Sequence, residues 1–315
     1  MKNPLLFPLL AAALIFGCTQ RPSDTGGTTA APGQEDQPEA NYDTPPFIID
    51  AHVHYRPNDE WEKSFLEVYA EHNAMACLMI RMDDLERGIN FAKANPDRII
   101  PYAMIDIDSP TILDDVKTVH AMGFKGLGEF FARNEWNYDD PKYDPLWALA
   151  EELGMPLAPH TGNLSNGMMA RLRPGYLASI AANHPDLIIV GAHFGNPWYA
   201  EAGEAARRNK NLYFDLSGSS LIKKENDPGI WKEYLWWTDY VGKKTPHMPD
   251  DLVPAFEKIV FASDESPDAL VENFRRFNKV LDANNVSEET RAKCYGLTMA
   301  RIHGINVEAV TNKTE

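Results

Sequence analysis

The chain has 315 residues, of which 44% are hydrophobic, and a formal net charge of -16 at pH 7. This length is enough to bury a large core, and because α/β barrels of about 250 residues form single domains, it does not require two domains. The acidity excludes nucleic acid as the main partner, since binding phosphates needs a basic face.

The N-terminal residues have the pattern of an export signal. Lys2 supplies a positive charge, and residues 4–17 are almost entirely apolar but too few to span a membrane comfortably. The run ends in Ile15-Phe16-Gly17-Cys18, which resembles a bacterial lipobox. That resemblance implies cleavage after residue 17 and a lipid anchor on Cys18, which would tether the protein in the bacterial cell envelope, facing the periplasm or the exterior. Ordinary secretion is the alternative. Residues 18–45 have the composition of a disordered tether.

From residue 46 to 305, short apolar runs alternate with amphipathic segments. Eight runs are predicted to be buried strands: 47–50, 75–80, 98–105, 124–128, 155–159, 187–192, 212–216 and 258–262. The segments with helical start and stop signals are 59–73, 83–95, 109–122, 144–153, 175–183, 197–208 and 267–283. This alternation predicts a (β/α)8 TIM barrel. An open doubly wound sheet is the alternative, but it would need a glycine-rich loop where His52-Val53-His54 stands.

Two further segments complete the predicted barrel domain. An aromatic-rich insertion between strands seven and eight is either a lid over the active site or a contact in a homodimer. Residues 287–303 are predicted to form a C-terminal helix with Ser287 as its N-cap, and residues 306–315 a flexible tail. The aromatic residues of the insertion are Trp231, Trp236, Trp237 and Tyr240.

Histidine and acidic side chains stand at the carboxyl ends of the predicted strands, where TIM barrels have their active sites. Two histidines at positions i and i+2 of an extended segment point the same way, so His52 and His54 can meet one ion. The other histidines, outside the strand ends, fall in helices or loops. The candidate residues at strand ends are His52, His54, Glu129, His160, His193 and Asp264.

The donor types indicate which metal such a site would take. Neutral imidazole and carboxylate suit zinc, with manganese or iron as alternatives. A thiolate site is not expected, because Cys77 and Cys294 lack CxxC spacing. Both cysteines are predicted to be buried and unpaired, with a disulfide between them as the alternative.

Seven segments of the barrel carry a family resemblance through their order and spacing. They are 49–54 (IDAHVH), 95–98 (NPDR), 123–126 (GFKG), 155–162 (MPLAPHTG), 184–196 (HPDLIIVGAHFGN), 211–217 (NLYFDLS) and 260–264 (VFASD). Over residues 46–305 the chain resembles the amidohydrolase superfamily and, within it, the amidohydrolase-related (amidohydrolase 2) branch. The resemblance implies a metal-dependent TIM-barrel enzyme.

The resemblance also implies a role for each candidate residue. His52, His54 and His160 would be metal ligands, and Asp264 would be a further ligand or the general base. His193 would bind a second metal or, as in single-metal members, act on the substrate. In such enzymes the metal lowers the pKa of water toward ~7 and polarises the scissile carbonyl, while the base takes the proton of the water.

Glu129 departs from the pattern of this branch. Many binuclear members have a carboxylated lysine on strand four, whereas Leu127-Gly128-Glu129 resembles the Gly-Glu of TatD-type hydrolases, whose carboxylate contacts metal. An ion pair with Arg133 is the alternative role, and Lys125 is expected deeper in the barrel and not carboxylated. The number of ions, one or two, therefore stays open. Glu265, where relatives often have an aromatic residue, predicts a more polar pocket wall.

Loop residues beyond strands four to six are the candidates for contact with a small-molecule substrate. Arg171 and Arg173 are further candidates for binding a substrate carboxylate, with plain surface arginines as the alternative. The loop candidates are Arg133, Trp136, Asn163 and Trp198.

Three functions fit these residues. Metal-dependent hydrolysis of an amide, lactone or other ester is favoured. The alternative from the same branch is non-oxidative decarboxylation of an aromatic or dienoic acid, but its usual cytoplasmic setting conflicts with the export signal. A non-catalytic metal- or ligand-binding lipoprotein is the third, and the complete ligand set argues against it. Nuclease activity is disfavoured by the acidic charge.

Overall fold

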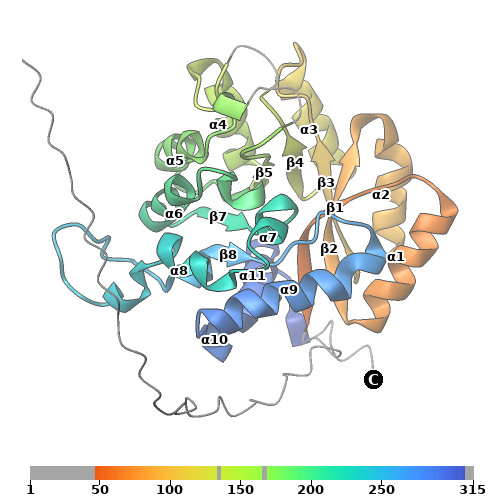
Figure 1. Ribbon diagram of the computed structural model, residues 1–315. Helices are drawn as coiled ribbons and strands as arrows, with labels where there is room; N and C mark the ends of the chain where they lie inside the picture. Colours follow the sequence, from red (N-terminus) through yellow and green to blue (C-terminus); the bar gives the residue numbers. More distant parts are fainter. Residues whose placement is uncertain (1–46, 133–135, 165–168, 309–315) are drawn as a thin grey trace, which may run out of the picture. The chain divides into compact units, whose positions relative to one another are not determined.

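Eight parallel strands in sequential order form the centre of the computed structural model, which describes residues 47–132, 136–164 and 169–308 (Figure 1). Every predicted strand is present. The strands are β1 (Ile48–His54), β2 (Ala74–Arg81), β3 (Ile99–Met104), β4 (Gly126–Phe130), β5 (Leu157–Pro159), β6 (Ile189–Gly191), β7 (Leu212–Asp215) and β8 (Ile259–Val260).

Main-chain hydrogen bonds between β1 and the segment after β8 bring the two edges of the sheet together. The Ala51 amide donates to the Phe261 carbonyl at 2.9 Å, and the Asp264 amide donates to the His52 carbonyl at 2.9 Å. These bonds leave a nearly closed barrel, so the predicted TIM barrel is confirmed over the open sheet. They also join the strand that carries His52 to the segment that carries Asp264.

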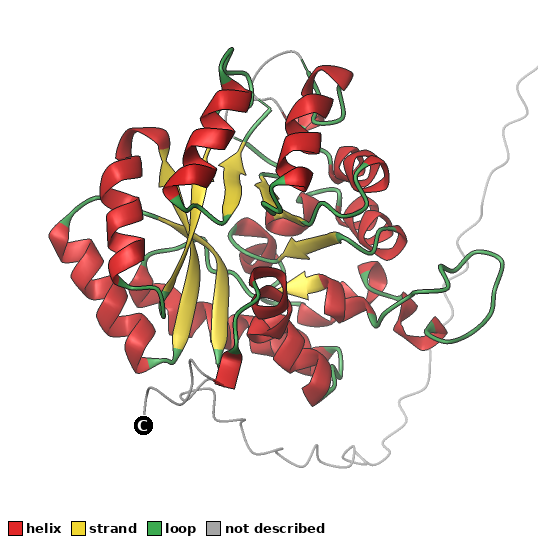
Figure 2. Cartoon of the chain, turned by 180° about the vertical axis from the view of Figure 1, so that it is seen from behind, coloured by secondary structure: helices red, strands yellow, loops and turns green. Residues whose placement is uncertain are grey.

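Helices surround the strands on the outside of the barrel (Figures 1 and 2). Local signals set several of their ends. Gly123, with φ 105°, ends α3 in the left-handed region, in agreement with the predicted helix end at residue 122. The Ser287 side chain accepts a hydrogen bond from the Thr290 amide at the start of α10, as predicted for this N-cap. The helices are α1 (Asp59–Glu71), α2 (Leu85–Ala94), α3 (Ile112–Met122), α4 (Asp144–Glu152), α5 (Pro174–Asn183), α6 (Tyr199–Arg208), α7 (Ser219–Lys223), α8 (Trp231–Tyr234), α9 (Leu270–Ala283), α10 (Glu288–Ala292) and α11 (Thr298–His303).

The C-terminal helix α11 closes the amino ends of the strands. Met299 and Ala300 pack into the cluster that fills the barrel interior, together with Ile49, Tyr102 and Tyr213. The predicted terminal helix is present, but it contains a π-helical turn at Lys293–Leu297. With its floor closed in this way, the barrel has its candidate site at the opposite, carboxyl end.

The insertion between β7 and β8 uses two of its tryptophans for packing. Trp231 is fully buried, and its ring centroid lies 5.4 Å from that of Phe194 and 5.3 Å from that of Tyr199. Trp237 is also fully buried, and its Nε1 donates to the Val253 carbonyl at 3.0 Å. These two residues attach the insertion to the chain's own core. Of the predicted aromatic set, Trp236 and Tyr240 remain exposed, and the lid and homodimer roles stay predictions.

Cys77 and Cys294 are buried and unpaired, as predicted. Within the described ranges, no helix has both the length and the apolar composition needed to cross a membrane. The predicted signal peptide, Cys18 and the tether lie outside the described residues, as does most of the predicted tail.

The pH dependence of stability should contain a contribution from His303 on the barrel floor. Its Nε2 lies 2.9 Å from the Tyr102 hydroxyl, and burial, with the nearby charge of Lys125, lowers its pKa from 6.5 to about 4. The unfolded chain therefore binds the proton more readily between these two values, so stability decreases as pH falls from 6.5 to 4. We expect the free energy of unfolding to drop by up to about 3 kcal/mol more in the wild type than in His303→Gln over this range. Urea unfolding at a series of pH values tests this, and identical pH profiles for the two proteins would contradict it.

Candidate metal centre

Irregularities in two strands turn the candidate ligands into the barrel. Ile49 and Ala51 belong to the interior cluster, so strict alternation would also point Val53 inward and both histidines of β1 outward. The pairing of β1 with β2 shifts register between Asp50 and Val53, and Val53 packs in the outer core. His52 and His54 therefore face inward, as a β-bulge allows.

Strand β4 repeats this arrangement at Glu129. Its pairing with β5 shifts register between Gly128 and Phe130, and Leu127 and Phe130 both belong to the outer core. The shift lets Glu129, rather than Phe130, face the interior. Strands β1 and β4 therefore extend beyond the strands predicted at 47–50 and 124–128. The polar residues at their carboxyl ends face the barrel interior and still belong to the strands.

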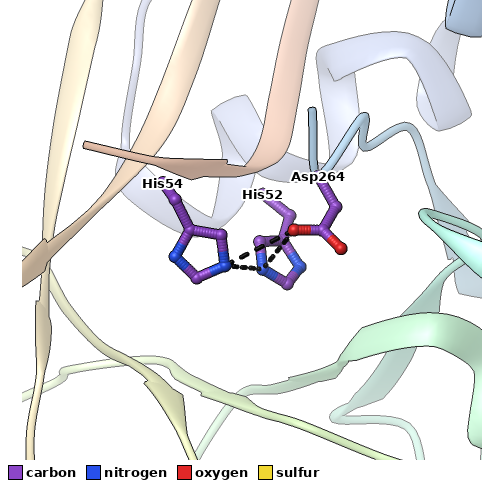
Figure 3. A group of neighbouring side chains, drawn as sticks. All are labelled: His52, His54 and Asp264. Atoms are coloured by element: carbon purple, nitrogen blue, oxygen red, sulfur yellow. Dashed lines mark hydrogen bonds and ion pairs between the residues drawn. The ribbon is translucent and has the colours of Figure 1, made fainter. Parts of the chain in front are cut away.

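Four side chains from three parts of the chain meet at the carboxyl end of β1. The Nε2 atoms of His52 and His54 are 3.2 Å apart, and they lie 3.6 and 3.4 Å from Asp264 Oδ1 (Figure 3). Figure 3 shows the two rings and the carboxylate turned toward one another. Glu129 Oε2 joins them, 3.7 Å from His52 Nε2 and 3.4 Å from His54 Nε2.

The second oxygen of Glu129 faces another pair of histidines. Oε1 lies 2.6 Å from His160 Nδ1 and 3.5 Å from His193 Nε2. Asp264 approaches this side too, with Oδ2 3.9 Å from His193 Nε2. The structure thus brings all six predicted site residues together, and Glu129 lies between two groups of donors.

The spacing of these donors fits metal binding. A tetrahedral ion with ligands at about 2.0–2.1 Å has ligand atoms roughly 3.3–3.4 Å apart, close to the separations in the first group. At His160, Nε2 lies 3.2 Å from the Asn163 carbonyl, which can only accept a hydrogen bond, so Nδ1 is left facing Glu129 Oε1. At 2.6 Å these two atoms are hydrogen-bonded through a shared proton, which a metal ion would have to displace, since two ligands of one tetrahedral ion lie farther apart.

Two of the site residues have backbone conformations that are rare for side-chain-bearing residues. φ is 63° at His193 and 54° at Asp264. The His193 amide donates to the Asp215 carboxylate, and the Asp264 amide donates to the His52 carbonyl, so both conformations are held by hydrogen bonds. Gly218, also in the left-handed region, leaves room beside them. A Cβ at this position would lie 3.1 Å from Asp264 Oδ2 and 3.3 Å from His193 Nδ1.

The buried charges of the site stabilise one another. Burial alone raises the pKa of Glu129, but the neighbouring histidines, His52 first, hold it well below its usual range. Burial likewise lowers the pKa of His52, yet Asp264 and Glu129 raise it well above its ordinary value. Carboxylates packed this densely need positive charge beside them, which the histidines supply and a divalent cation would supply as well.

Asp215, at the end of β7, was missed by the sequence analysis. Its Oδ2 lies 3.4 Å from His52 Nδ1, and its Oδ1 accepts from the His193 amide at 2.8 Å and from the Ser217 hydroxyl at 2.7 Å. Ser217 Oγ in turn lies 3.0 Å from His193 Nδ1. One carboxylate therefore orients histidines from both groups and directs His52 Nε2 toward the centre. Its place at a strand end was the signal that could have identified it.

Asp50 is a second buried carboxylate that sequence reasoning left out. It accepts from the Tyr69 hydroxyl at 2.9 Å and from the amides of His52 and Ser263 at 3.1 and 2.9 Å. Burial raises its pKa to about 6, although these bonds favour the ionised form. Asp50 thus ties the segment carrying Asp264 to β1.

The predicted substrate residues have more varied surroundings. Asn163 borders the site through its carbonyl, whereas Trp136 is exposed beneath the Lys142 ammonium. The Trp198 ring lies 5.1 Å from the Arg173 guanidinium, which also binds Glu201. Arg173 is therefore engaged within the fold, in line with the alternative role.

Two further predictions concern Arg133 and Lys125. Arg133 lies outside the described residues, so its pairing with Glu129 and its substrate role stay predictions. Lys125 lines a pocket with His303 at the amino end of the barrel, away from the candidate ligands, as expected.

Removing the charge of Asp215 should weaken metal binding through the two histidines that it contacts. In Asp215→Asn, the amide no longer fixes His52 and His193, and loss of such a partner typically lowers metal affinity about 10–100-fold. Competition with a chromogenic chelator measures the affinity, and Asp186→Asn on an exposed turn is the matched control. Equal affinities in wild type and Asp215→Asn would contradict the role assigned to Asp215.

Comparison with known proteins agrees with this architecture. An uncharacterised TIM-barrel protein from Bordetella bronchiseptica superposes with a TM-score of 0.61 at 16% identity, covering 82% of this chain and 98% of the other. 5-Carboxyvanillate decarboxylase from Sphingomonas paucimobilis superposes with a TM-score of 0.55 at 14% identity, covering 82% of this chain and 99% of the other. Dihydroorotase from Campylobacter jejuni superposes with a TM-score of 0.52 at 17% identity, covering 82% of this chain and 83% of the other. These identities show a shared fold, and two of the neighbours are enzymes.

No curated protein matches the sequence. Residues 70–304 match the family described as amidohydrolase, and this match covers well over half of the chain. The chain belongs to the amidohydrolase family.

Proposed function

We propose that this protein is a metal-dependent hydrolase that cleaves an amide, lactone or other ester in a small molecule. The observation that carries the proposal is the position of Glu129, whose two oxygens face two different groups of histidines. Such an arrangement suits a carboxylate shared by two ions. The membership of the family supports metal-dependent chemistry, and the donor set supports the site.

The donors favour zinc, with manganese as the alternative. His52, His54, Asp264 and Glu129 Oε2 would hold one ion, and His160, His193 and Glu129 Oε1 would hold a second. A divalent ion in these positions polarises a carbonyl oxygen and makes water more acidic.

Asp264 is the proposed general base. Its side chain is 24% exposed whereas that of Glu129 is 4% exposed, so among these two carboxylates it is the one that a substrate and water can reach. Burial raises its pKa, but His52 and the other histidines lower it below the ordinary value, so it is ionised at neutral pH. An ionised carboxylate in this position can accept a proton from the attacking water and return it to the leaving group.

Substrate selection would fall to the loops around these residues. Asn163 borders His160, and we propose that Trp198 and Trp136 line the approach to the site. Glu265 is exposed directly after the proposed base, and we propose that it makes the pocket wall more polar. Such a wall would suit a small polar substrate.

The choice between hydrolysis and decarboxylation can be made with the metal-reconstituted protein. A panel of lactones, amides, esters and aromatic acids is incubated with protein loaded with zinc or manganese, and both acid release and carbon dioxide are measured. Hydrolysis of at least one lactone, amide or ester supports the proposal. Release of carbon dioxide from an aromatic acid without any hydrolysis would replace it with the decarboxylase alternative.

Turnover of the best substrate should depend on the charge of Asp264. In Asp264→Asn we expect kcat to fall about 10²–10⁴-fold at saturating metal, because the amide cannot accept the proton. Circular dichroism and elemental analysis establish that the variant is folded and metal-loaded. Asp139→Asn, an exposed aspartate away from the cluster, is the control. Full activity in folded, loaded Asp264→Asn would remove Asp264 from catalysis.

We also propose that the protein is anchored to the cell envelope by a lipid on Cys18. The support is the sequence around this cysteine and the tether-like composition that follows it. Labelling of producing cells with a radioactive fatty acid should mark the wild type but not Cys18→Ser, which should also leave the membrane fraction. Labelling that persists in Cys18→Ser would contradict the anchor.

A further inference from the structure

A cavity of about 440 Å³ lies on the amino side of the barrel, away from the metal centre. Its walls come from the start of β7, the segment before β8, the insertion and the C-terminal helices. This volume is within the range of small-molecule sites. The cationic residues that line it are Arg207, Lys210, Lys258, Lys293 and Arg301, and the acidic ones are Asp251 and Glu257.

The cavity is cationic in a protein of net charge -16. Some of its charge is neutralised, since Lys293 Nζ lies 2.8 Å from Glu257 and Arg207 pairs with Glu204 at 2.6 Å. Lys210 and Arg301 form no ion pair with a carboxylate in the part of the chain that the structure describes. Positive charge therefore remains in excess on the cavity wall.

Lys258 and Arg301 converge on one aromatic ring. The Lys258 ammonium lies 4.5 Å and the Arg301 guanidinium 5.9 Å from the Tyr213 ring centroid, and Arg301 also donates to the Tyr213 hydroxyl at 2.9 Å. Lys258 is only 4% exposed. Burial, with a smaller contribution from Arg301, lowers the pKa of Lys258 to about 8, although the charges of Asp251 and Glu257 oppose this shift.

The end of helix α6 accounts for part of this arrangement. Lys258 Nζ donates to the carbonyls of Asn209 and Lys210 at 2.8 and 2.9 Å, as a cation at a helix C-terminus does. An ammonium has three hydrogens, so one is left for a further acceptor. The helix end does not account for Arg301 on the opposite wall, nor for the open volume between the walls.

We propose that this cavity binds a small dianion, either a dicarboxylate or a phosphate- or sulfate-type oxyanion. Such a ligand would accept hydrogen bonds from the remaining hydrogen of Lys258 and from the guanidinium of Arg301, and its charge would offset the excess positive charge of the cavity wall. The five cationic residues of the wall, set against Asp251, Glu257 and the Glu204 that pairs with Arg207, leave an excess of two positive charges, which a dianion matches better than a monoanion does. The site is separate from the catalytic one, so its existence does not depend on the proposed hydrolysis.

Isothermal titration calorimetry of the metal-loaded protein with sulfate and with succinate tests the proposal. Ionic strength is kept constant with sodium chloride, because screening weakens every charged contact. We expect one dianion per chain with a Kd of about 0.1–10 mM, weakened at least about 5-fold by Arg301→Gln and by Lys210→Gln. Both substituted side chains are exposed, so the fold should tolerate either change. Lys244→Gln, exposed and outside the cavity, should bind like the wild type.

The outcomes separate the ligand classes. Tighter sulfate binding identifies an oxyanion site of the phosphate type, and tighter succinate binding identifies a dicarboxylate site. No binding of either dianion would overturn the proposal. Binding that is unchanged in both Arg301→Gln and Lys210→Gln would also overturn it, since the anion would then be at the metal centre or elsewhere.

Discussion

The burial of Glu129 among histidines is the constraint on which the candidate site depends. A carboxylate removed from water is stable only with compensating positive charge and hydrogen bonds. That compensation comes from His52 and His54 on β1, His160 after β5 and His193 after β6. Asp215 and Ser217 in turn orient two of these histidines, through contacts with the Nδ1 atoms of His52 and His193. The carboxyl ends of several strands must therefore come together in the correct register before the buried charge of Glu129 or of any of these histidines is compensated.

Much of this arrangement could be predicted from the sequence. The alternation of strands and helices gave the barrel, and the positions of histidine and acidic residues after strands gave all six members of the cluster. Barrel topology explains this success, because carboxyl ends of parallel strands converge whatever their exact register. The cap at Ser287 and the helix end at Gly123 depend on local chemistry and were predicted for that reason.

Other features depend on long-range contacts that a single sequence does not display. The register shifts in β1 and β4 decide which residues face inward, and they are set by pairing with β2 and β5. Asp215 matters because β7 brings it behind His52, a residue far away in the chain. Trp231 and Trp237 were associated with a lid or a subunit contact, but their burial depends on how the insertion folds back onto α6. In each case the deciding partner is remote in sequence.

The hydrogen bonds between β1 and the segment after β8 have a consequence for how the chain is held together. The first strand carries His52 and His54, and the last segment of the barrel carries Asp264, so one set of donors spans the seam of the barrel. A cation held by these residues would act as a cross-link between the two ends of the folded chain. Because a ligand that binds only the folded state stabilises it by mass action, such a cation would link metal supply to resistance to unfolding. The seam would then be strongest in the metal-loaded protein, and proteolytic or thermal opening there would report directly on metal occupancy.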